Sequence, residues 1–218
     1  IIYSNMSDLH LLPNRKIYAW GNGIFGQLGN NEENNNQPIP TLVSSSQKIS
    51  SIYARYCNSF AFIYNPLGKT NGLSLLAWGR AQQGSLGKVE TGLNIKAPSN
   101  FIYSDLIENK KIVSFSVNRE HGGLVTEDGE VFTWGIDYEG RLGHQGLYYQ
   151  LKKEKKFQAI SKEESQSRFV YVHNSNMSPL SHAIFHKIVL PEEFKEKKFA
   201  QISCGTTFTT LLSQEGEV

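Results

Sequence analysis

A short pattern that occurs three times constrains the fold of this chain more than any other feature. It consists of two apolar residues, one variable residue, Trp-Gly, four variable residues and then Gly-x-Leu-Gly. The chain has three tryptophans, and all of them occupy the same slot of this pattern, 58 and 56 residues apart. Such a recurrence indicates a repeat protein in which each repeat is one structural unit. The recurring positions are Trp20, Gly21, Gly26, Leu28, Gly29, Trp78, Gly79, Gly84, Leu86, Gly87, Trp134, Gly135, Gly140, Leu142 and Gly143.

A second element precedes the tryptophan pattern and also recurs. The segment 111–117 leads through Asp128-Gly129 into the third copy of the pattern, and the segment that ends in Cys204-Gly205 is its counterpart further along the chain. This register predicts a fourth tryptophan three residues after Val218, so we interpret the chain as a piece of a larger protein. The repeat units are expected to span roughly residues 1–47, 48–110, 111–197 and 198–218, the last of them incomplete.

The apolar runs within each unit are typical of β-strands. They are short, rich in β-branched and aromatic residues, and bounded by Gly, Asn and Pro. Runs near 100–104, 111–117, 122–126 and 130–134 give about four strands per unit. Four antiparallel strands per repeat predict an all-β fold made of propeller blades. The glycines of the pattern would let the chain leave the third strand through conformations closed to other residues, with the leucine packed between blades.

These residues resemble the repeat of the regulator of chromosome condensation family. The segment Gly26-Gln27-Leu28-Gly29 matches the ending of that family's blade in full, and the glutamine of this ending becomes Ser85 and Arg141 in the later copies. The Cys-Gly pair of the family survives as Cys204-Gly205. The resemblance covers nearly the whole chain apart from residues 144–185, and it implies a seven-bladed β-propeller. The chain would then hold three to four divergent blades, a partial ring.

Composition argues against several function classes. Lys and Arg exceed Asp and Glu by only two, and 19% charged residues give no field that favours a general nucleic-acid or membrane-surface binder. The longest apolar runs, such as 60–64, are far shorter than the ~20 residues of a membrane-spanning helix. Cys57 and Cys204 form no Cys-x-x-Cys pair, so we expect two buried free thiols in a reducing compartment, and hence an intracellular protein of the cytoplasm or nucleus.

One glycine motif resembles a nucleotide-binding loop. Residues 21–26 satisfy the Gly-x-Gly-x-x-Gly fingerprint, which depends on a helix N-terminus to hold a pyrophosphate. In the other two copies of the repeat, however, the middle glycine is replaced by Ala81 and Asp137. The repeat therefore favours a structural turn, and no cofactor is expected.

The histidines suggest no catalytic or metal site. His182 and His186 have the i, i+4 spacing of a helical zinc pair, but no Glu or Cys accompanies them, and we expect surface residues before a strand. His121 fills a repeat slot that holds Asn58 and Phe208 in other units, a variation that favours packing. No nucleophile, paired carboxylate or phosphate loop stands out either, so the prediction is no catalytic residue, no metal and no enzyme.

Residues 146–185 depart from the repeat and are expected to form an inserted loop. A loop of this length is usually functional, disordered or both, so it could be a solvated excursion or a partner-binding arm. Its basic run, 152–156, is interrupted by a glutamate, so it is only a weak indication of nucleic acid or chromatin as a binding partner.

The function expected from these features is a protein-interaction scaffold. Propellers commonly bind partners through loops at their rims. The alternative, taken from the founding member of the family, is guanine nucleotide exchange on a small nuclear GTPase combined with chromatin binding. The open edges of a partial ring are a further expected site of pairing, with another copy as the partner. The interaction residues predicted here are Phe25, Gln83, Tyr138, Glu139, Tyr148 and Tyr149.

Overall fold

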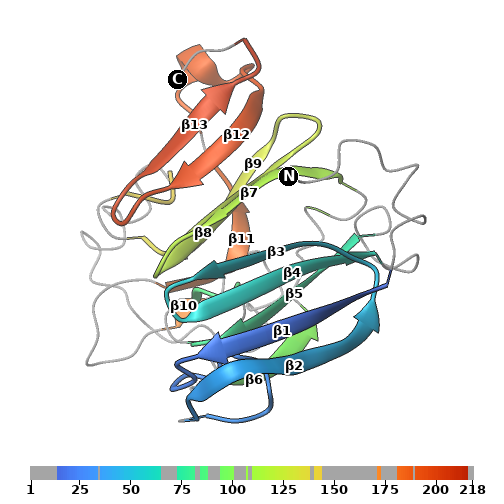
Figure 1. The fold of residues 1–218 in the computed structure, drawn as a ribbon. Helices are drawn as coiled ribbons and strands as arrows, with labels where there is room; N and C mark the ends of the chain where they lie inside the picture. Colours follow the sequence, from blue (N-terminus) through green and yellow to red (C-terminus); the bar gives the residue numbers. More distant parts are fainter. Residues whose placement is uncertain are drawn as a thin grey trace, which may run out of the picture. The chain divides into compact units, whose positions relative to one another are not determined.

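The computed structural model describes part of the chain, and most of the described residues lie in β-strands. The described residues are 14–33, 35–64, 73–81, 84–87, 94–100, 107, 110–137, 140–143, 171–172, 181–188 and 190–215. They form two compact units, which are described separately: unit 1 comprises residues 1–82 and 91–111, and unit 2 comprises residues 83–90 and 112–218. The strands pair antiparallel throughout (Figure 1), which confirms the predicted all-β class. Among the described residues, no helix could cross a lipid bilayer.

Unit 1 contains two antiparallel sheets. The first pairs β1 (Arg15–Gly21) with β2 (Gln37–Gln47), and the second has the order β3-β4-β5-β6. Its strands are β3 (Ile49–Arg55), β4 (Asn58–Tyr64), β5 (Leu73–Gly79) and β6 (Ile95–Asn100). This second sheet has the four antiparallel strands expected of a blade, although its last strand starts at Ile95 rather than near residue 100.

The two sheets of unit 1 share one hydrophobic core. Its buried members are Ile17, Ile49, Ala61, Leu76 and Trp78, with Val43, Ile63 and Ile95 packed against them. Side chains alternate between the two faces of a strand. Ile17 of β1 therefore faces this core, whereas its neighbour Tyr18 is exposed on the opposite face.

Unit 2 contains a five-stranded sheet and a two-stranded sheet. The larger one has the order β10-β11-β9-β8-β7, and the smaller one pairs β12 with β13. Their strands are β7 (Ile112–Val117), β8 (His121–Thr126), β9 (Val131–Ile136), β10 (Tyr171–Val172), β11 (Ser181–Lys187), β12 (Phe199–Cys204) and β13 (Thr209–Ser213), and a short 3-10 helix, η5, spans Glu192–Phe194. Every residue of β8 and β9 is buried, as expected for strands covered on both faces.

Several local predictions differ from the structure. Within the segment predicted as an inserted loop, Tyr171 and Val172 form β10 and β11 begins at Ser181, while residues 146–170 and 173–180 lie outside the described residues. His182 and His186 lie inside β11, not before a strand. A tight turn at Asp128-Gly129 joins β8 to β9: the Gly129 amide donates to the Thr126 carbonyl at 2.8 Å, and the φ of Gly129 is +84°.

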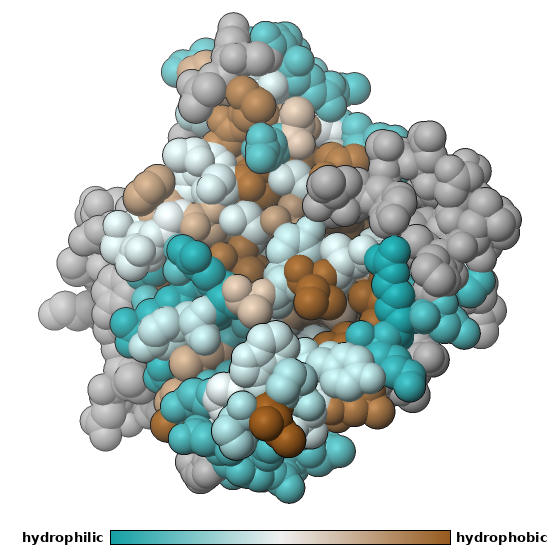
Figure 2. Space-filling view, in the orientation of Figure 1, coloured by the Kyte–Doolittle hydropathy of each residue, from teal (hydrophilic) through white to brown (hydrophobic). Residues whose placement is uncertain are grey.

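The core of unit 2 joins its two sheets face to face. Val125 and Val131 from the larger sheet pack with Ile202 and Cys204 of β12. Hydrophobic residues nevertheless reach the surface of both units among hydrophilic ones (Figure 2).

Candidate functional site

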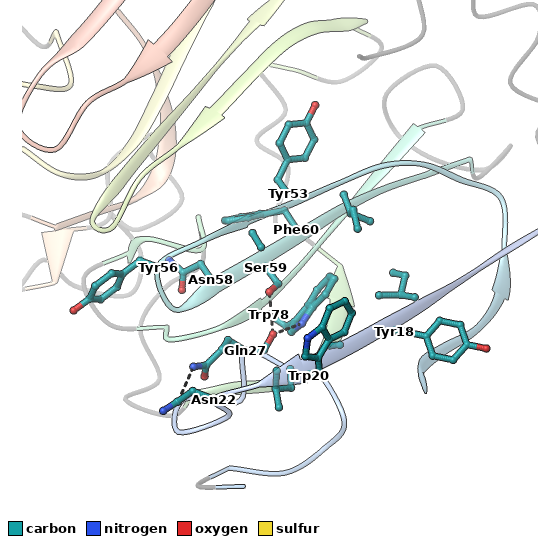
Figure 3. A pocket seen from close by; sticks show the side chains of 15 residues that line it. Tyr18, Trp20, Asn22, Gln27, Tyr53, Tyr56, Asn58, Ser59, Phe60 and Trp78 are labelled. Atoms are coloured by element: carbon teal, nitrogen blue, oxygen red, sulfur yellow. Dashed lines mark hydrogen bonds between the residues drawn. The ribbon is translucent and has the colours of Figure 1, made fainter. Parts of the chain in front are cut away.

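The tryptophan of one repeat is held by the repeat that precedes it. In unit 1, Trp78 is buried, and its indole Nε1 donates to the main-chain carbonyl of Gln27 at 2.9 Å. The Ser59 hydroxyl donates to the same carbonyl at 2.9 Å, as Figure 3 shows. Gln27 belongs to the Gly-x-Leu-Gly ending of the first pattern. We call the three endings tails: tail 1 is 26–29, tail 2 is 84–87 and tail 3 is 140–143.

Unit 2 repeats this arrangement with other residues. The indole Nε1 of Trp134, which is fully buried, donates to the carbonyl of Ser85 in tail 2 at 3.2 Å. In tail 3, the carbonyl of Arg141 accepts a bond of 2.8 Å from the hydroxyl of Thr209, which occupies the same repeat slot as Ser59. The variable residue of each tail thus presents its main-chain carbonyl to the following repeat, so its side chain is free to differ.

The tail glycines are required by this contact. Each tail is closed by a hydrogen bond from its last glycine amide to the carbonyl of its first glycine, at 2.9 Å in tails 1 and 2 and 3.0 Å in tail 3. In tail 1, Gly29 has a φ of +75°, and an added Cβ would lie 2.7 Å from Nε1 of Trp78. A larger residue there would therefore be strained and would displace the tryptophan. The leucines within the tails, Leu28, Leu86 and Leu142, are all buried.

Trp20 differs from the other two tryptophans because it lies on the surface. Its side chain is 61% exposed, and Tyr18, two residues earlier on the same face of β1, is 49% exposed. Beside them is a groove of about 410 Å³, shown in Figure 3. We call it the open groove, and it is lined by Ile17, Tyr18, Ala19, Trp20, Asn22, Gln27, Leu28, Ile52, Tyr53, Ala54, Tyr56, Asn58, Ser59, Phe60 and Trp78.

Trp20 was predicted as a repeat residue, but most of the residues of this groove were not predicted as a site. Tyr18 and Ile52 were not singled out, although both carry a usable signal. Tyr18 has the same strand parity as Trp20, and Ile52 shares a repeat slot with Ile202, which packs in a core. A search for repeat positions whose equivalents are buried would have found both residues.

One predicted interaction residue lies in a second feature of unit 1, which we call the rim patch: the exposed Tyr56 together with the half-buried Phe25 and Arg80. The guanidinium of Arg80 lies over the Phe25 ring, 5.2 Å from its centroid. The Arg80 amide donates to the carbonyl of Cys57 at 2.9 Å, which brings the β3–β4 turn next to it. Tyr56, in that turn, is 61% exposed.

The other predicted interaction residues cannot be placed in this way. Gln83, Tyr138, Glu139, Tyr148 and Tyr149 all lie outside the described residues. The rim patch therefore joins one predicted residue, Phe25, with two that the sequence analysis did not select.

Unit 2 contains a buried polar cluster around Arg141. The Arg141 guanidinium donates to the Thr206 carbonyl at 3.1 Å and pairs with the Glu120 carboxylate at 3.3 Å. His121 is fully buried, and its Nε2 lies 3.2 Å from the Thr209 hydroxyl. Burial, and secondly the Arg141 charge, lower the pKa of His121 to about 4. The imidazole is therefore neutral near pH 7, and the contacts of the cluster link β8, β13 and tail 3.

The two cysteines are free but differ in burial. Cys204 is buried, and burial raises the pKa of its thiol to about 11, so it is an unreactive core residue. Cys57 is only half-buried, which corrects the expectation that both thiols are buried, because it lies in the exposed β3–β4 turn. Within the described parts of the chain, no group of three or more His, Cys, Asp or Glu side chains could hold a metal ion.

Comparisons with known proteins agree with the repeat geometry. The Regulator of chromosome condensation (RCC1) repeat matches residues 16–56. The crystal structure of Kap60 bound to yeast RCC1 (Prp20) contains a chain that superposes with a TM-score of 0.63 at 18% identity, over 92% of this chain and 38% of that one.

Longer proteins also match. The probable E3 ubiquitin-protein ligase HERC4 of Rattus norvegicus is 26% identical over 178 residues, which are 82% of this chain and 16% of that protein. The probable E3 ubiquitin-protein ligase HERC3 of Homo sapiens is 26% identical over 183 residues, which are 83% of this chain and 16% of that protein. The chain thus spans about a sixth of the length of these relatives.

These relatives overturn the expectation that the protein is not an enzyme, because they are named as ubiquitin ligases. The expectation was wrong because it extended the lack of a recognisable nucleophile in 218 residues to the whole protein. What the comparisons and the tail contacts establish together is the fold: this chain has the fold of part of an RCC1-like β-propeller, and its residues 16–56 match the regulator of chromosome condensation repeat.

Proposed function

We propose that this chain is the partner-recruiting propeller segment of a protein related to ubiquitin ligases. The observation that carries the proposal is the rim patch: Arg80 stacks on Phe25, and its amide is bonded to the turn in which Tyr56 is exposed. Aromatic residues and arginine are enriched at the centres of protein interfaces, where a few such residues supply most of the binding energy. The named ligases that match four-fifths of this chain support a role within a larger enzyme.

The fold also favours this assignment. Stacked sheets hold the rim turns in fixed positions, because the β3–β4 turn and the residue after Trp78-Gly79 are joined by the bond between Arg80 and Cys57. Residues on a rigid scaffold lose little entropy when they bind. The two free cysteines favour a reducing compartment, which supports a second part of the proposal, that the protein acts in the cytoplasm or nucleus.

Affinity capture from a cell lysate tests this function, with three forms of the chain compared side by side. The wild type and a Phe194→Ala control, altered at an exposed residue of unit 2, should capture the same proteins. The double variant Tyr56→Ala, Arg80→Ala should lose them, with an expected drop in affinity of tenfold or more for a true hot spot (roughly 1.4 kcal/mol per tenfold). Probing the recovered proteins for attached ubiquitin tests the link to ligases.

Two results would argue against the proposal. If all three forms capture the same proteins equally well, the rim patch is not part of the binding interface. Accelerated release of a fluorescent nucleotide from a small GTPase, caused by the chain and unaffected by the double variant, would instead favour guanine nucleotide exchange.

A further inference from the structure

Strands β2, β6 and β11 share an irregularity that the repeat places at one position. Each of them pairs with the strand that carries a repeat tryptophan, namely β1, β5 and β9. Opposite Trp78, a step of two residues along β5 corresponds to a step of four residues along β6, from Ile95 to Ser99. The same shift occurs opposite Trp20 and Trp134. Each of the three strands therefore has two extra residues opposite its tryptophan, a β-bulge that recurs with the fold.

The recurrent bulge defines a common slot in these three strands. The last residue of the bulge is Pro40 in β2, Pro98 in β6 and Phe185 in β11. The bulge of β2 contains a second proline, Pro38. Proline has no N–H group to donate to a neighbouring strand, and within sheets it is confined to edges and bulges. Strands β2 and β6 therefore have proline at this slot, whereas β11 contains none.

Strand β11 is covered instead by an added strand. Strand β10 comes from the segment that was expected to be an inserted loop, and it pairs antiparallel with β11, with Tyr171 opposite His182 and Val172 opposite Ser181. Among the strands that the structure describes, none pairs with the corresponding side of β2 or β6. The strand that lacks the proline is thus the one that carries the extra strand.

We propose that β10 is an edge guard, which takes the place of the missing proline and prevents β11 from pairing with a second copy of this chain. An uncovered strand edge presents N–H and C=O groups that pair with other strands unless proline interrupts it or another strand covers it. Phe185 returns an N–H group to the slot that Pro40 and Pro98 occupy in the other strands. The pairing of β10 with Ser181 and His182 occupies the part of this edge that precedes the bulge.

The guard is short, so β11 is a latent surface for strand addition. Two paired residues form few hydrogen bonds, and a longer extended segment that displaced them would form more. β11 lies between β9 and β12 in the chain, away from both ends of the sequence. The rim patch takes no part in this arrangement, so the proposal stands independently of the proposed function.

Removal of the guard is the first test. The double variant Tyr171→Pro, Val172→Pro cannot donate backbone hydrogen bonds from β10 to β11. Sedimentation velocity of this variant and of the wild type, at matched concentrations, measures self-association. The double variant should associate at concentrations about tenfold lower, because a tenfold change corresponds to roughly one or two added strand hydrogen bonds. If it associates no more than the wild type, the proposal is overturned.

A rescue experiment then tests the edge itself. Phe185→Pro, added to the double variant, restores the proline of the slot and should return self-association to the wild-type level. Phe185→Ala is the matched control, because it removes the same side chain but keeps the N–H group, and it should not rescue. Rescue by both substitutions, or by neither, would show that the association does not arise from the backbone edge of β11 and would overturn the proposal.

Pro98→Ala tests the slot without altering β10. It returns an N–H group to β6, whose outer side no described strand covers, and should raise self-association above that of the wild type. Far-UV circular dichroism checks that each variant keeps its sheets. If Pro98→Ala remains folded and associates no more than the wild type, proline at this slot is not a guard, and the proposal is overturned even where the β10 variant fails to fold.

Discussion

Unit 1 and unit 2 contain the same repeat position in two different environments. Ile52 of β3 and Ile202 of β12 occupy one slot of the repeat, yet the first is 62% exposed and the second 3% exposed. Ile202 packs against β8 so closely that a Cβ on Gly123 would lie 2.3 Å from its Cδ1. Its amide also donates to the Ser114 hydroxyl at 3.1 Å. Ile52, in contrast, lines the open groove of unit 1, where no described strand covers it.

The tryptophans show the same contrast. Trp134 and Trp78 are 0% and 3% exposed because a preceding tail binds each indole, whereas Trp20 is 61% exposed. The burial of a residue in this fold is therefore decided by the neighbouring repeat and not by its own strand. Each repeat supplies half of a core, as expected for proteins whose stability is a sum of repeat and interface contributions.

The largest expected effect comes from truncating the two kinds of tryptophan. Trp134→Ala should lower the free energy of unfolding by about 3–5 kcal/mol, because it removes a fully buried ring, its contact with Phe115 and its bond to Ser85. Trp20→Ala should cost less than about 1 kcal/mol. Urea unfolding of both variants at low protein concentration measures the difference, and equal losses would contradict the contrast between the two environments.

Truncating the two isoleucines should also destabilise the buried position more than the exposed one, with a smaller difference in unfolding free energy than for the tryptophans. Ile202→Ala is expected to cost about 2–4 kcal/mol, since it opens a cavity between the two sheets of unit 2. Ile52→Ala should cost under about 1 kcal/mol, because its side chain is largely in water. Denaturant midpoints of the two variants provide the measurement. If Ile52→Ala lowers the unfolding free energy as much as Ile202→Ala does, then Ile52 is buried in solution and the contrast is contradicted.

The buried His121, whose repeat slot holds Asn58 and Phe208 in other units, should make the stability of unit 2 depend on pH. The unfolded His121 binds a proton near its ordinary pKa of 6.5, whereas the buried side chain does so only near pH 4. The free energy of unfolding should therefore fall as pH decreases from about 6.5 to 4, by at most about 3 kcal/mol. His121→Asn, which places the residue of the Asn58 slot there, should remove most of this slope. Thermal melts across this range decide it, and an identical slope in the variant would contradict the assignment.

Two glycines give the smallest expected contrast. Gly21 and Gly79 share a slot and have φ values of +102° and +113°. A Cβ at Gly79 would lie 2.2 Å from the Cys57 carbonyl oxygen, whereas nothing lies within 4 Å of one at Gly21. Both Ala variants carry the strain of a positive φ, about 1–3 kcal/mol, so Gly79→Ala should exceed Gly21→Ala by a further 1 kcal/mol or so. Similar melting temperatures for the two variants would show that β4 moves to accommodate the methyl group.

The repeat in the sequence predicted where the strands lie, but not how one repeat contacts the next. The pattern around Trp20, Trp78 and Trp134 lies on β1, β5 and β9, as its short apolar runs predicted. The glycine after each tryptophan has a positive φ and ends or nearly ends its strand. The alignment also identifies equivalent positions. It does not say that the Gln27 carbonyl binds Trp78 of the next repeat, since that bond joins residues 51 apart and uses a main-chain atom that no side-chain pattern reveals.

The rim patch was only partly predictable for a related reason. Phe25 could be selected as a loop residue after Trp-Gly, whereas Tyr56 and Arg80 gain their roles from the β3–β4 turn. The strands β10 and β11 were missed because the segment that holds them carries no repeat signal. Apolar residues such as Tyr171 and Val172 were attributed to an inserted loop, although they add to the edge of the sheet.

Acrylamide quenching of tryptophan fluorescence tests the central claim most directly, at a concentration where the chain is monomeric. If a preceding tail shields each tryptophan, one of the three indoles should be readily quenched, and Trp20→Phe should abolish that component while leaving the protected emission of Trp78 and Trp134. Quenching that is equal for all three tryptophans, or an accessible component that survives Trp20→Phe, would contradict the account.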